Sequence, residues 1–185
     1  MPARRVLGGI GAQQTPEREG ASKIGAGGER QALVRLRQLM PLPPPGEVWA
    51  GDDAAVVHVP TSPGLLLLAS DCLVAGLDAD LGLTTLADLG WKAMAVNLSD
   101  IAAMGGRPLH AVVSVVGLNV RQLEEVYTGL LSAAGHYSCP VVGGDLSSGP
   151  EGVVSVAVTG WVDGPPVLRS GAQAGDAIWV TGLLG

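Results

Sequence analysis

Four short acidic motifs each place an aspartate beside small or polar residues, next to an apolar segment. They are Gly51-Asp52-Asp53-Ala54-Ala55, Ala69-Ser70-Asp71, Asn97-Leu98-Ser99-Asp100 and Gly143-Gly144-Asp145. Carboxylate and hydroxyl oxygens without histidine or thiolate partners suit magnesium. Several aspartates in one cleft would repel one another unless cations neutralised them. The motifs together predict a site in which four carboxylates hold magnesium and a nucleotide polyphosphate: those of Asp53, Asp71, Asp100 and Asp145.

Each aspartate taken alone is also explained by a turn or a helix cap, where Asp is a preferred residue. Gly143 and Gly144 would let the backbone approach a phosphate closely, because neither has a side chain. Arg169 lies in a glycine-flanked loop and is either a bidentate phosphate clamp or an ordinary surface arginine. Other ionisable residues are assigned to turns, helix ends, the surface or the structural interior: Asp80, Asp88, Asp163, Asp176, His58, His110 and His136.

Several other kinds of site lack their sequence signals. Cys72 and Cys139 are the only cysteines and form no Cys-x-x-Cys or Cys/His cluster, so a zinc site is not expected and both thiols are predicted to be reduced. Gly25-Ala26-Gly27-Gly28 follows no strand and precedes no Lys-Ser/Thr pair, so it is not a Walker-type phosphate loop.

The net charge is −6 and is unevenly distributed. Residues 1–40 hold seven basic and three acidic side chains, whereas residues 41–185 hold four basic and fourteen acidic ones. Because residues 41–185 are so acidic, they are expected to bind nucleic acid poorly and could bind phosphates only through cations. Solubility is the simpler explanation of an acidic surface. No signal-peptide pattern and no apolar span of about 20 residues is present, so the sequence predicts a cytoplasmic protein without a membrane partner.

The chain is 47% hydrophobic and contains no Phe, so Val, Leu, Ala and Ile must build its core. Hydrophobic periodicity predicts helices over residues 29–40, 84–104 and 120–135. Thr84 or Thr85 would cap the second helix, and Gly105-Gly106 would end it. Strands are expected at six places, of which 65–70 is an uninterrupted apolar run typical of a buried strand; the others are 54–59, 109–118, 140–142, 152–162 and 177–181.

The composition also divides the chain. Residues 1–28 have no sustained periodicity and are predicted to be a flexible N-terminal extension. Residues 29–163 hold the acidic motifs and are predicted to form an N-terminal domain that binds magnesium and a nucleotide polyphosphate. Asp163-Gly164-Pro165-Pro166 is a linker signal. Residues 164–185 are therefore expected to be a linker and the start of a truncated C-terminal domain.

Five segments, in this order, resemble the thiamine-monophosphate kinase family: GDDAA at 51–55, SDCLVAG at 70–76, KAMAVNLSDIAAMG at 92–105, GGD at 143–145 and LRSGA at 168–172. That family belongs to the ATP-binding superfamily of aminoimidazole ribonucleotide synthetase. The resemblance covers about residues 29–185. Its most family-specific parts are residues 97–105 and the loop around Arg169, whereas related superfamily members share the other motifs.

The resemblance implies ATP-dependent phosphorylation of thiamine monophosphate to thiamine diphosphate, with magnesium as the cofactor. It implies an α+β fold whose mixed, mainly antiparallel sheet carries helices on one face and forms a homodimer. By position it matches metal ligands to Asp53, Ser70, Asp71, Asp100 and Asp145, and ATP contacts to Gly144, Asp145 and Arg169. No side chain is predicted as a catalytic nucleophile, because phosphoryl transfer proceeds by positioning and charge neutralisation.

Two positions depart from the family pattern. Ala69 leaves Ser70 as the only hydroxyl before Asp71, where many members have two. Asp78-Ala79 stands where the family usually has a His-Phe pair whose histidine faces the substrate, so Asp78 is carried over as a candidate substrate contact. Two other functions stay open: another ATP-using enzyme of the superfamily, or a truncated, non-catalytic module that binds nucleotide and dimerises.

Overall fold

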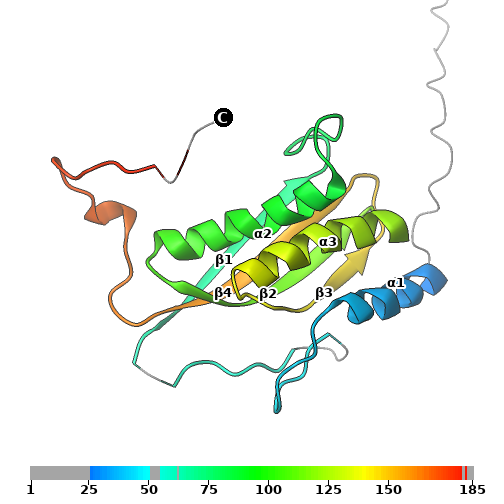
Figure 1. Ribbon diagram of the computed structural model, residues 1–185, viewed down its shortest axis with the longest axis horizontal. Helices are drawn as coiled ribbons and strands as arrows, with labels where there is room; N and C mark the ends of the chain where they lie inside the picture. The colour runs from blue at the N-terminus through cyan, green and yellow to red at the C-terminus, as the bar shows by residue number, and fades with distance from the viewer. Residues whose placement is uncertain (1–25, 51–54, 62, 181, 183–185) are drawn as a thin grey trace, which may run out of the picture.

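A single four-stranded sheet organises the chain in the computed structural model, which describes residues 26–50, 55–61, 63–180 and 182. The strands are β1 (Leu65–Val74), β2 (Arg107–Val116), β3 (Val141–Ser147) and β4 (Val153–Val162), in the spatial order β1-β4-β2-β3. β4 runs antiparallel to both β1 and β2, whereas β2 and β3 are parallel. The predicted mixed, mainly antiparallel sheet is therefore confirmed (Figure 1).

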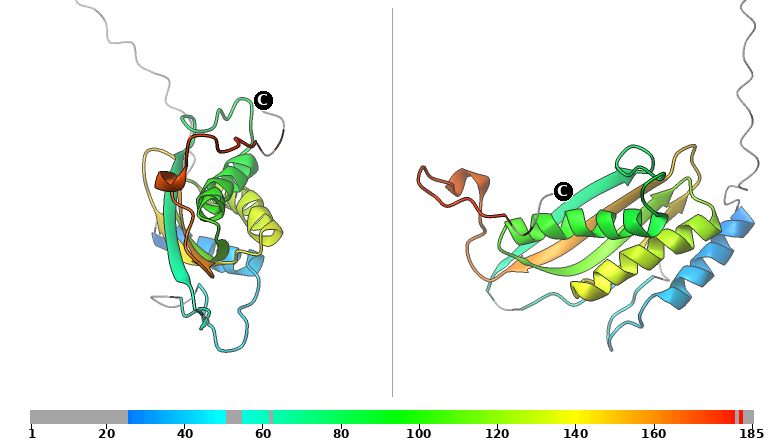
Figure 2. Two further views of the ribbon diagram at one scale, coloured as in Figure 1. Left: turned by 90° about the vertical axis from the view of Figure 1, so that its left-hand side faces the viewer. Right: turned by 45° about the horizontal axis from the view of Figure 1, so that its top comes forward.

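Three helices accompany the sheet: α1 (Ala26–Leu39), α2 (Leu86–Ala103) and α3 (Val120–His136). Figure 2 shows α2 and α3 together on one face of the sheet, with α1 beside α3. The opposite face, which we call the open face, carries no helix among the described residues. The predicted α+β fold with helices on one face is thus confirmed. None of the helices in the described part of the chain is both long and apolar enough to cross a bilayer.

The ends of α2 follow its sequence signals. Thr85 is the N-cap, and its side chain and that of Asp88 each bond the other residue's backbone N–H in a capping box. The hydrogen bond from the Thr85 backbone lowers the pKa of Asp88. The helix ends at Ala103, and Gly105 then turns the chain with φ of 74°, a conformation that glycine adopts without strain.

α2 and α3 approach each other closely because two glycines face across their contact. A Cβ atom on Gly90 would lie 2.9 Å from the Val126 carbonyl carbon, and one on Gly129 would lie 2.6 Å from that of Ala87. Both distances are far shorter than an ordinary carbon–carbon contact. The N-terminal half of α2 is therefore held against α3 by packing that admits no larger residue.

Alternation along the strands separates the two faces. Residues on the helix side of the central strands are buried, among them Val113, Val115, Val154 and Val156. On the open face the apolar side chains of Leu66, Leu68 and Val112 are exposed, Leu68 to 75%. The expectation that residues 65–70 form a strand is right, but the expectation that it is buried is wrong. β1 is an edge strand, and none of the helices or strands that the structure describes covers its outer face.

Two other expected strands are absent from the described residues. Around 54–59 the structure has one isolated bridge, between Val48 and Val56. Residues 177–180 form no strand, and their apolar side chains are exposed, Ile178 to 96%. An extended apolar segment forms a strand only where a neighbouring strand completes its hydrogen bonds, and neither segment has such a neighbour over its length.

Candidate functional site

Asp145 reaches the open face through a bulge in β3. Ala111 pairs with Val141, but Val112 pairs with Gly143, so Val142 is an extra residue on β3. A shift of one residue exchanges the two faces of a strand. Asp145 consequently lies opposite Ser114 on the open face, exposed, with its Oδ2 accepting a hydrogen bond from the Ser147 hydroxyl at 3.2 Å.

The two glycines before Asp145 differ in whether the packing around them requires glycine. A Cβ on Gly144 would lie 2.7 Å from the carbonyl carbon of Val113, so this glycine is required by the packing of β3 against β2. A Cβ on Gly143 would meet only Val112 Cγ1 at 3.8 Å and Ala55 Cβ at 4.0 Å, which are ordinary contacts. The fold alone therefore does not require glycine at position 143.

Asp71 lies at the other edge of the sheet, within β1. Its neighbours Ala69 and Leu73 pack into the core, so Asp71 is on the side of the helices. Its backbone N–H donates to Oδ1 of Asn97 on α2 at 2.8 Å. Ser70 points to the open face and donates to the Val156 carbonyl at 3.2 Å. Successive residues of a strand face opposite ways, so the Ser70 and Asp71 side chains do not converge within this chain.

Asp100 and the Arg169 loop both lie toward the C-terminal end of α2. Asp100 is exposed one turn after Asn97. The N–H of Val167 donates to the Met104 carbonyl at 3.0 Å, and this bond attaches the loop to the helix end. Arg169 begins a short 3-10 turn there, Arg169–Gly171, and lines a shallow hollow of about 520 Å³.

The predicted ligands thus fall into two groups. Asp100 is in the C-terminal half of α2, and Asp71 and the Arg169 loop are each attached to that half by a hydrogen bond, whereas Asp145 lies on the opposite face at the far edge of the sheet. Asp53 lies outside the described residues. Within the residues that the structure describes, no three Asp, Glu, His or Cys side chains are close enough to hold one metal ion. A single rim that unites Asp71, Asp100 and Asp145 is therefore not present in one copy of the chain.

The donor chemistry of the α2 group nevertheless suits magnesium. Both the Asp71 and the Asp100 carboxylates are exposed, and neither makes an ion pair or side-chain hydrogen bond with the described residues. Magnesium usually takes one or two protein carboxylates and completes its octahedron with water and phosphate oxygens. The two exposed carboxylates of this group match that requirement in ligand type and number.

Glu47 links the segment before the Asp52-Asp53 pair to the segment after it by hydrogen bonds. Its Oε1 accepts from the His58 backbone N–H at 2.9 Å and lies 3.2 Å from His58 Nδ1, and its Oε2 accepts from Trp49 Nε1 at 2.6 Å. The bond from the His58 backbone lowers the pKa of Glu47. Ala50 donates to the Val142 carbonyl at 2.7 Å, so the chain before residue 51 lies beside β3. The sequence analysis did not find this role of Glu47, because a glutamate eleven residues from its partner gives no pattern.

Asp78, the candidate substrate contact, is tied into the turn after β1. Its Oδ2 accepts from the Val74 N–H at 2.7 Å, and its carbonyl accepts from Lys92 Nζ at 2.5 Å. The side chain is exposed, but one carboxylate oxygen is already bonded. Three leucines on the same loop are also exposed: Leu77, Leu81 and Leu83.

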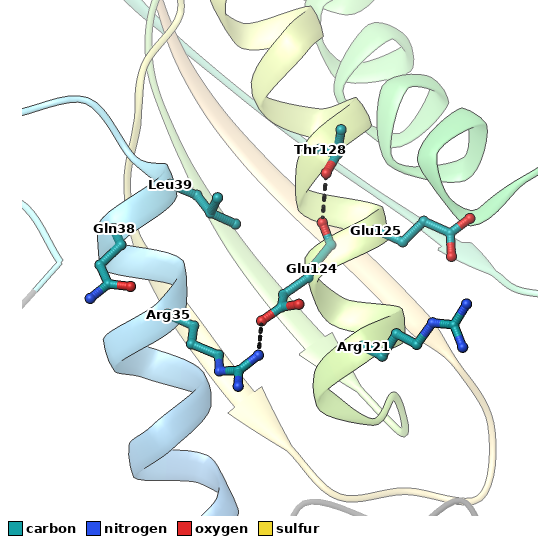
Figure 3. A pocket seen from close by; sticks show the side chains of 7 residues that line it. All are labelled: Arg35, Gln38, Leu39, Arg121, Glu124, Glu125 and Thr128. Carbon is teal, nitrogen blue, oxygen red and sulfur yellow. Dashed lines mark hydrogen bonds and ion pairs between the residues drawn. The ribbon is translucent and has the colours of Figure 1, made fainter.

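A second hollow, of about 660 Å³, lies between α1 and α3, away from all of these residues (Figure 3). Arg35 crosses it to Glu124 with a 2.8 Å ion pair, and Arg121 and Glu125 add one charge of each sign. The charges of this groove balance one another. It therefore has no net attraction for a polyphosphate and is not the candidate site.

Comparison with known proteins gives the family. The AIR synthase related protein, N-terminal domain, matches residues 51–162. The chain belongs to this family. The match spans β1 to β4, so it covers the whole sheet and both helices packed on it.

Within the AIR synthase related family, the similar curated proteins are thiamine-monophosphate kinases. The enzyme of Rhodopirellula baltica is 44% identical over 162 residues, which are 82% of this chain and 49% of that protein. The enzyme of Escherichia coli K12 is 37% identical over 142 residues, 75% of this chain and 43% of that protein. The chain thus spans at most about half the length of these relatives.

Solved structures agree on the fold. The thiamine monophosphate kinase of Aquifex aeolicus superposes with a TM-score of 0.56 at 34% identity, covering 63% of this chain and 42% of that one. AaThiL in complex with AMPPCP and TMP gives 0.57 at 35% identity, covering 62% and 38%. The hydrogenase maturation protein HypE of E. coli gives the same TM-score, 0.57, at only 19% identity, which shows a shared fold and nothing more.

Proposed function

We propose that the protein phosphorylates thiamine monophosphate to thiamine diphosphate, with ATP as phosphoryl donor. The observation that carries this proposal is the pair of free carboxylates, Asp71 and Asp100, beside a loop that presents Arg169. The 44% identity to a thiamine-monophosphate kinase and the AMPPCP and TMP bound by AaThiL support this choice of substrates. The cytoplasm is the location that such a substrate pair favours.

In this reaction the bond between the γ-phosphorus of ATP and its bridging oxygen breaks, and a phosphate oxygen of thiamine monophosphate takes the phosphoryl group. ADP leaves. Magnesium, when bound, neutralises the charge on the phosphates of both reactants. Asp71 and Asp100 would hold the cation through exposed carboxylates, and Arg169 would orient a phosphate through two parallel hydrogen bonds. No covalent intermediate on a side chain is required.

We further propose that a second copy of the chain covers the open face. Leu66 and Leu68 on the edge strand β1 and Val112 on β2 are exposed on this face, and burying them would remove apolar surface from water. Asp145 lies on the same face, whereas Asp71 is at the opposite edge, so one chain cannot bring the two together. In a dimer formed through the open face, an edge of the partner's sheet would lie beside an edge of the first sheet. A composite site would explain why the carboxylates divide into two groups.

Two variants test the dimer. Leu68→Asp places a charge on the open face, in the edge strand β1, whereas Leu83→Asp changes another exposed leucine, on the loop after β1. Analytical ultracentrifugation should show a dimer for the wild type and for Leu83→Asp, and a monomer for Leu68→Asp. A wild-type chain that stays monomeric at micromolar concentration would refute this part of the proposal.

Activity is tested by formation of ADP and thiamine diphosphate from ATP and thiamine monophosphate with and without magnesium. Asp100→Asn should lower turnover by at least about 100-fold, the scale of losing one preorganised electrostatic contact. Glu125→Gln, an exposed carboxylate on α3, is the matched control and should be neutral. An Asp100→Asn protein with unchanged rate and magnesium dependence would disprove the assigned role.

One observation favours a second function, that of a non-catalytic module that binds nucleotide and dimerises. Asp78 replaces the expected histidine, and one of its carboxylate oxygens is bonded to the Val74 N–H. Titration calorimetry with AMPPCP and magnesium, run beside the turnover assay, separates the two functions. Binding with turnover supports the kinase, and binding without turnover supports the module.

A further inference from the structure

Asn97 is the single fully buried polar or charged side chain among the residues that the structure describes. It lies on α2 between the core residues Met94, Leu98 and Ile101, with 0% of its surface exposed. An amide transferred from water to an apolar interior costs free energy unless its hydrogen bonds are replaced. A leucine at this position would pack without that cost, so core packing alone does not explain the residue.

Both ends of the Asn97 amide are bonded to backbone groups. Nδ2 donates to the Ala93 carbonyl one turn earlier in α2, at 2.9 Å. Oδ1 accepts from the Asp71 N–H on β1, at 2.8 Å. The first bond stays within the helix. The second joins α2 to the sheet at the residue whose carboxylate is a proposed magnesium ligand.

The location of Asp71 explains why this bond matters. β1 is an edge strand, so half of its backbone N–H groups have no neighbouring strand to accept them. Asn97 supplies the acceptor for Asp71 and fixes the backbone from which the carboxylate extends. Asp100 follows Asn97 by three residues, about one turn of helix. The same bond therefore sets the position of β1 relative to the turn of α2 that carries Asp100.

We propose that Asn97 is a positioning residue, which holds the Asp71 carboxylate in register with Asp100 so that both can bind one divalent cation. This inference rests on the proposed function, because it takes these two carboxylates as metal ligands. Asn97 itself does not touch the cation. Its effect is on the geometry of Asp71, as outer hydrogen-bond partners act on the ligands of metal sites.

The most selective variant is Asn97→Ser. A serine in a helix bonds the carbonyl four residues earlier, so it can keep the Ala93 bond, but its side chain is too short to reach Asp71. Met94→Ala is the matched control, because Met94 is fully buried on the same helix and its loss destabilises the protein without changing the Asp71 bond. Asp71→Asn reports the loss of the carboxylate itself.

Electron paramagnetic resonance can measure the affinity of the whole 185-residue chain for Mn2+ without nucleotide or substrate. This readout needs no turnover. We expect Asn97→Ser to weaken Mn2+ binding about 10- to 100-fold, the usual effect of losing such a partner. Met94→Ala should bind as the wild type does, and Asp71→Asn should lose the site. Wild-type affinity in Asn97→Ser, together with loss in Asp71→Asn, would overturn the positioning role and leave the proposed function intact.

Wild-type affinity in Asp71→Asn would instead overturn the metal role of Asp71, and the inference with it. A measurement on the unmodified chain covers the case in which the Asn97 variants do not fold. Amide hydrogen exchange of Asp71 should be slow, because its N–H is bonded to a buried acceptor. Exchange at the rate of a free edge-strand amide would show that the bond does not form, and would also refute the inference.

Discussion

Gly144→Ala should destabilise the protein, because the added methyl group has no space between β3 and β2. Its carbon would lie 2.7 Å from the Val113 carbonyl carbon, about 1 Å closer than an ordinary carbon–carbon contact. Moving β2 and β3 apart by that amount would stretch the flanking hydrogen bonds beyond the usual donor–acceptor distance. Two lost backbone bonds at about 1 kcal/mol each and about 1 kcal/mol of strain predict a loss of about 3 kcal/mol in the free energy of unfolding.

Gly143→Ala is the natural control, since the added methyl group would meet its nearest neighbours at 3.8 and 4.0 Å. We expect a change within about 0.5 kcal/mol, because the gain from restricting the unfolded chain is of that size. Urea denaturation measures both values. In a scan, Gly144→Ala should lower Tm by roughly 6 to 12 °C for a domain of this length. Equal stability of the two variants would refute the geometric argument.

The remaining predictions concern pH, thiol chemistry and a helix cap. Burial lowers the pKa of His110 below 6.5, so the unfolded state binds its proton more tightly; the free energy of unfolding should fall as pH drops below about 6.5, and His110→Gln should reduce that fall. An unchanged pH profile in His110→Gln would contradict this. Burial raises the pKa of Cys139 to about 12, so a thiol reagent at pH 8 should modify the exposed Cys72 quickly and Cys139 only after denaturation; two fast thiols in the folded protein would be inconsistent with the structure. Thr85→Ala removes the N-cap of α2 and should cost about 1 kcal/mol in urea denaturation, and a loss below about 0.3 kcal/mol would show that the cap contributes little.

The sequence predicted the helices well because their signals are local. The expected helix at 84–104 is Leu86–Ala103, and that at 120–135 is Val120–His136. The capping threonine and the terminal glycines act within one turn of the residues that they affect. The face of α2 was less predictable, since the large apolar side chain of Trp91 is 36% exposed, whereas the polar side chain of Asn97 is fully buried.

The placement of the acidic residues was predicted less well. Asp71 and Asp145 were expected to follow strands that end at residues 70 and 142, but β1 continues to Val74 and β3 to Ser147. The additional length comes from pairing with β4 and β2, which is a long-range effect. The bulge at Val142 that moves Asp145 to the open face likewise depends on the partner strand. Arg169 alone was placed in the loop and glycine context that the sequence indicated.

The glycine contact between α2 and α3 limits how the molecule can respond to a ligand. Gly90 and Gly129 couple the start of α2 to α3, while Asp100 lies near its other end. A helix clamped in this way cannot slide along its axis alone, so any pull on Asp100 would be transmitted as a tilt of the two helices together. Trp91 follows Gly90 in α2, and its ring lies 6.0 Å from that of His136 and 6.4 Å from that of Tyr137. The surroundings of the Trp91 ring should therefore change when a ligand moves Asp100.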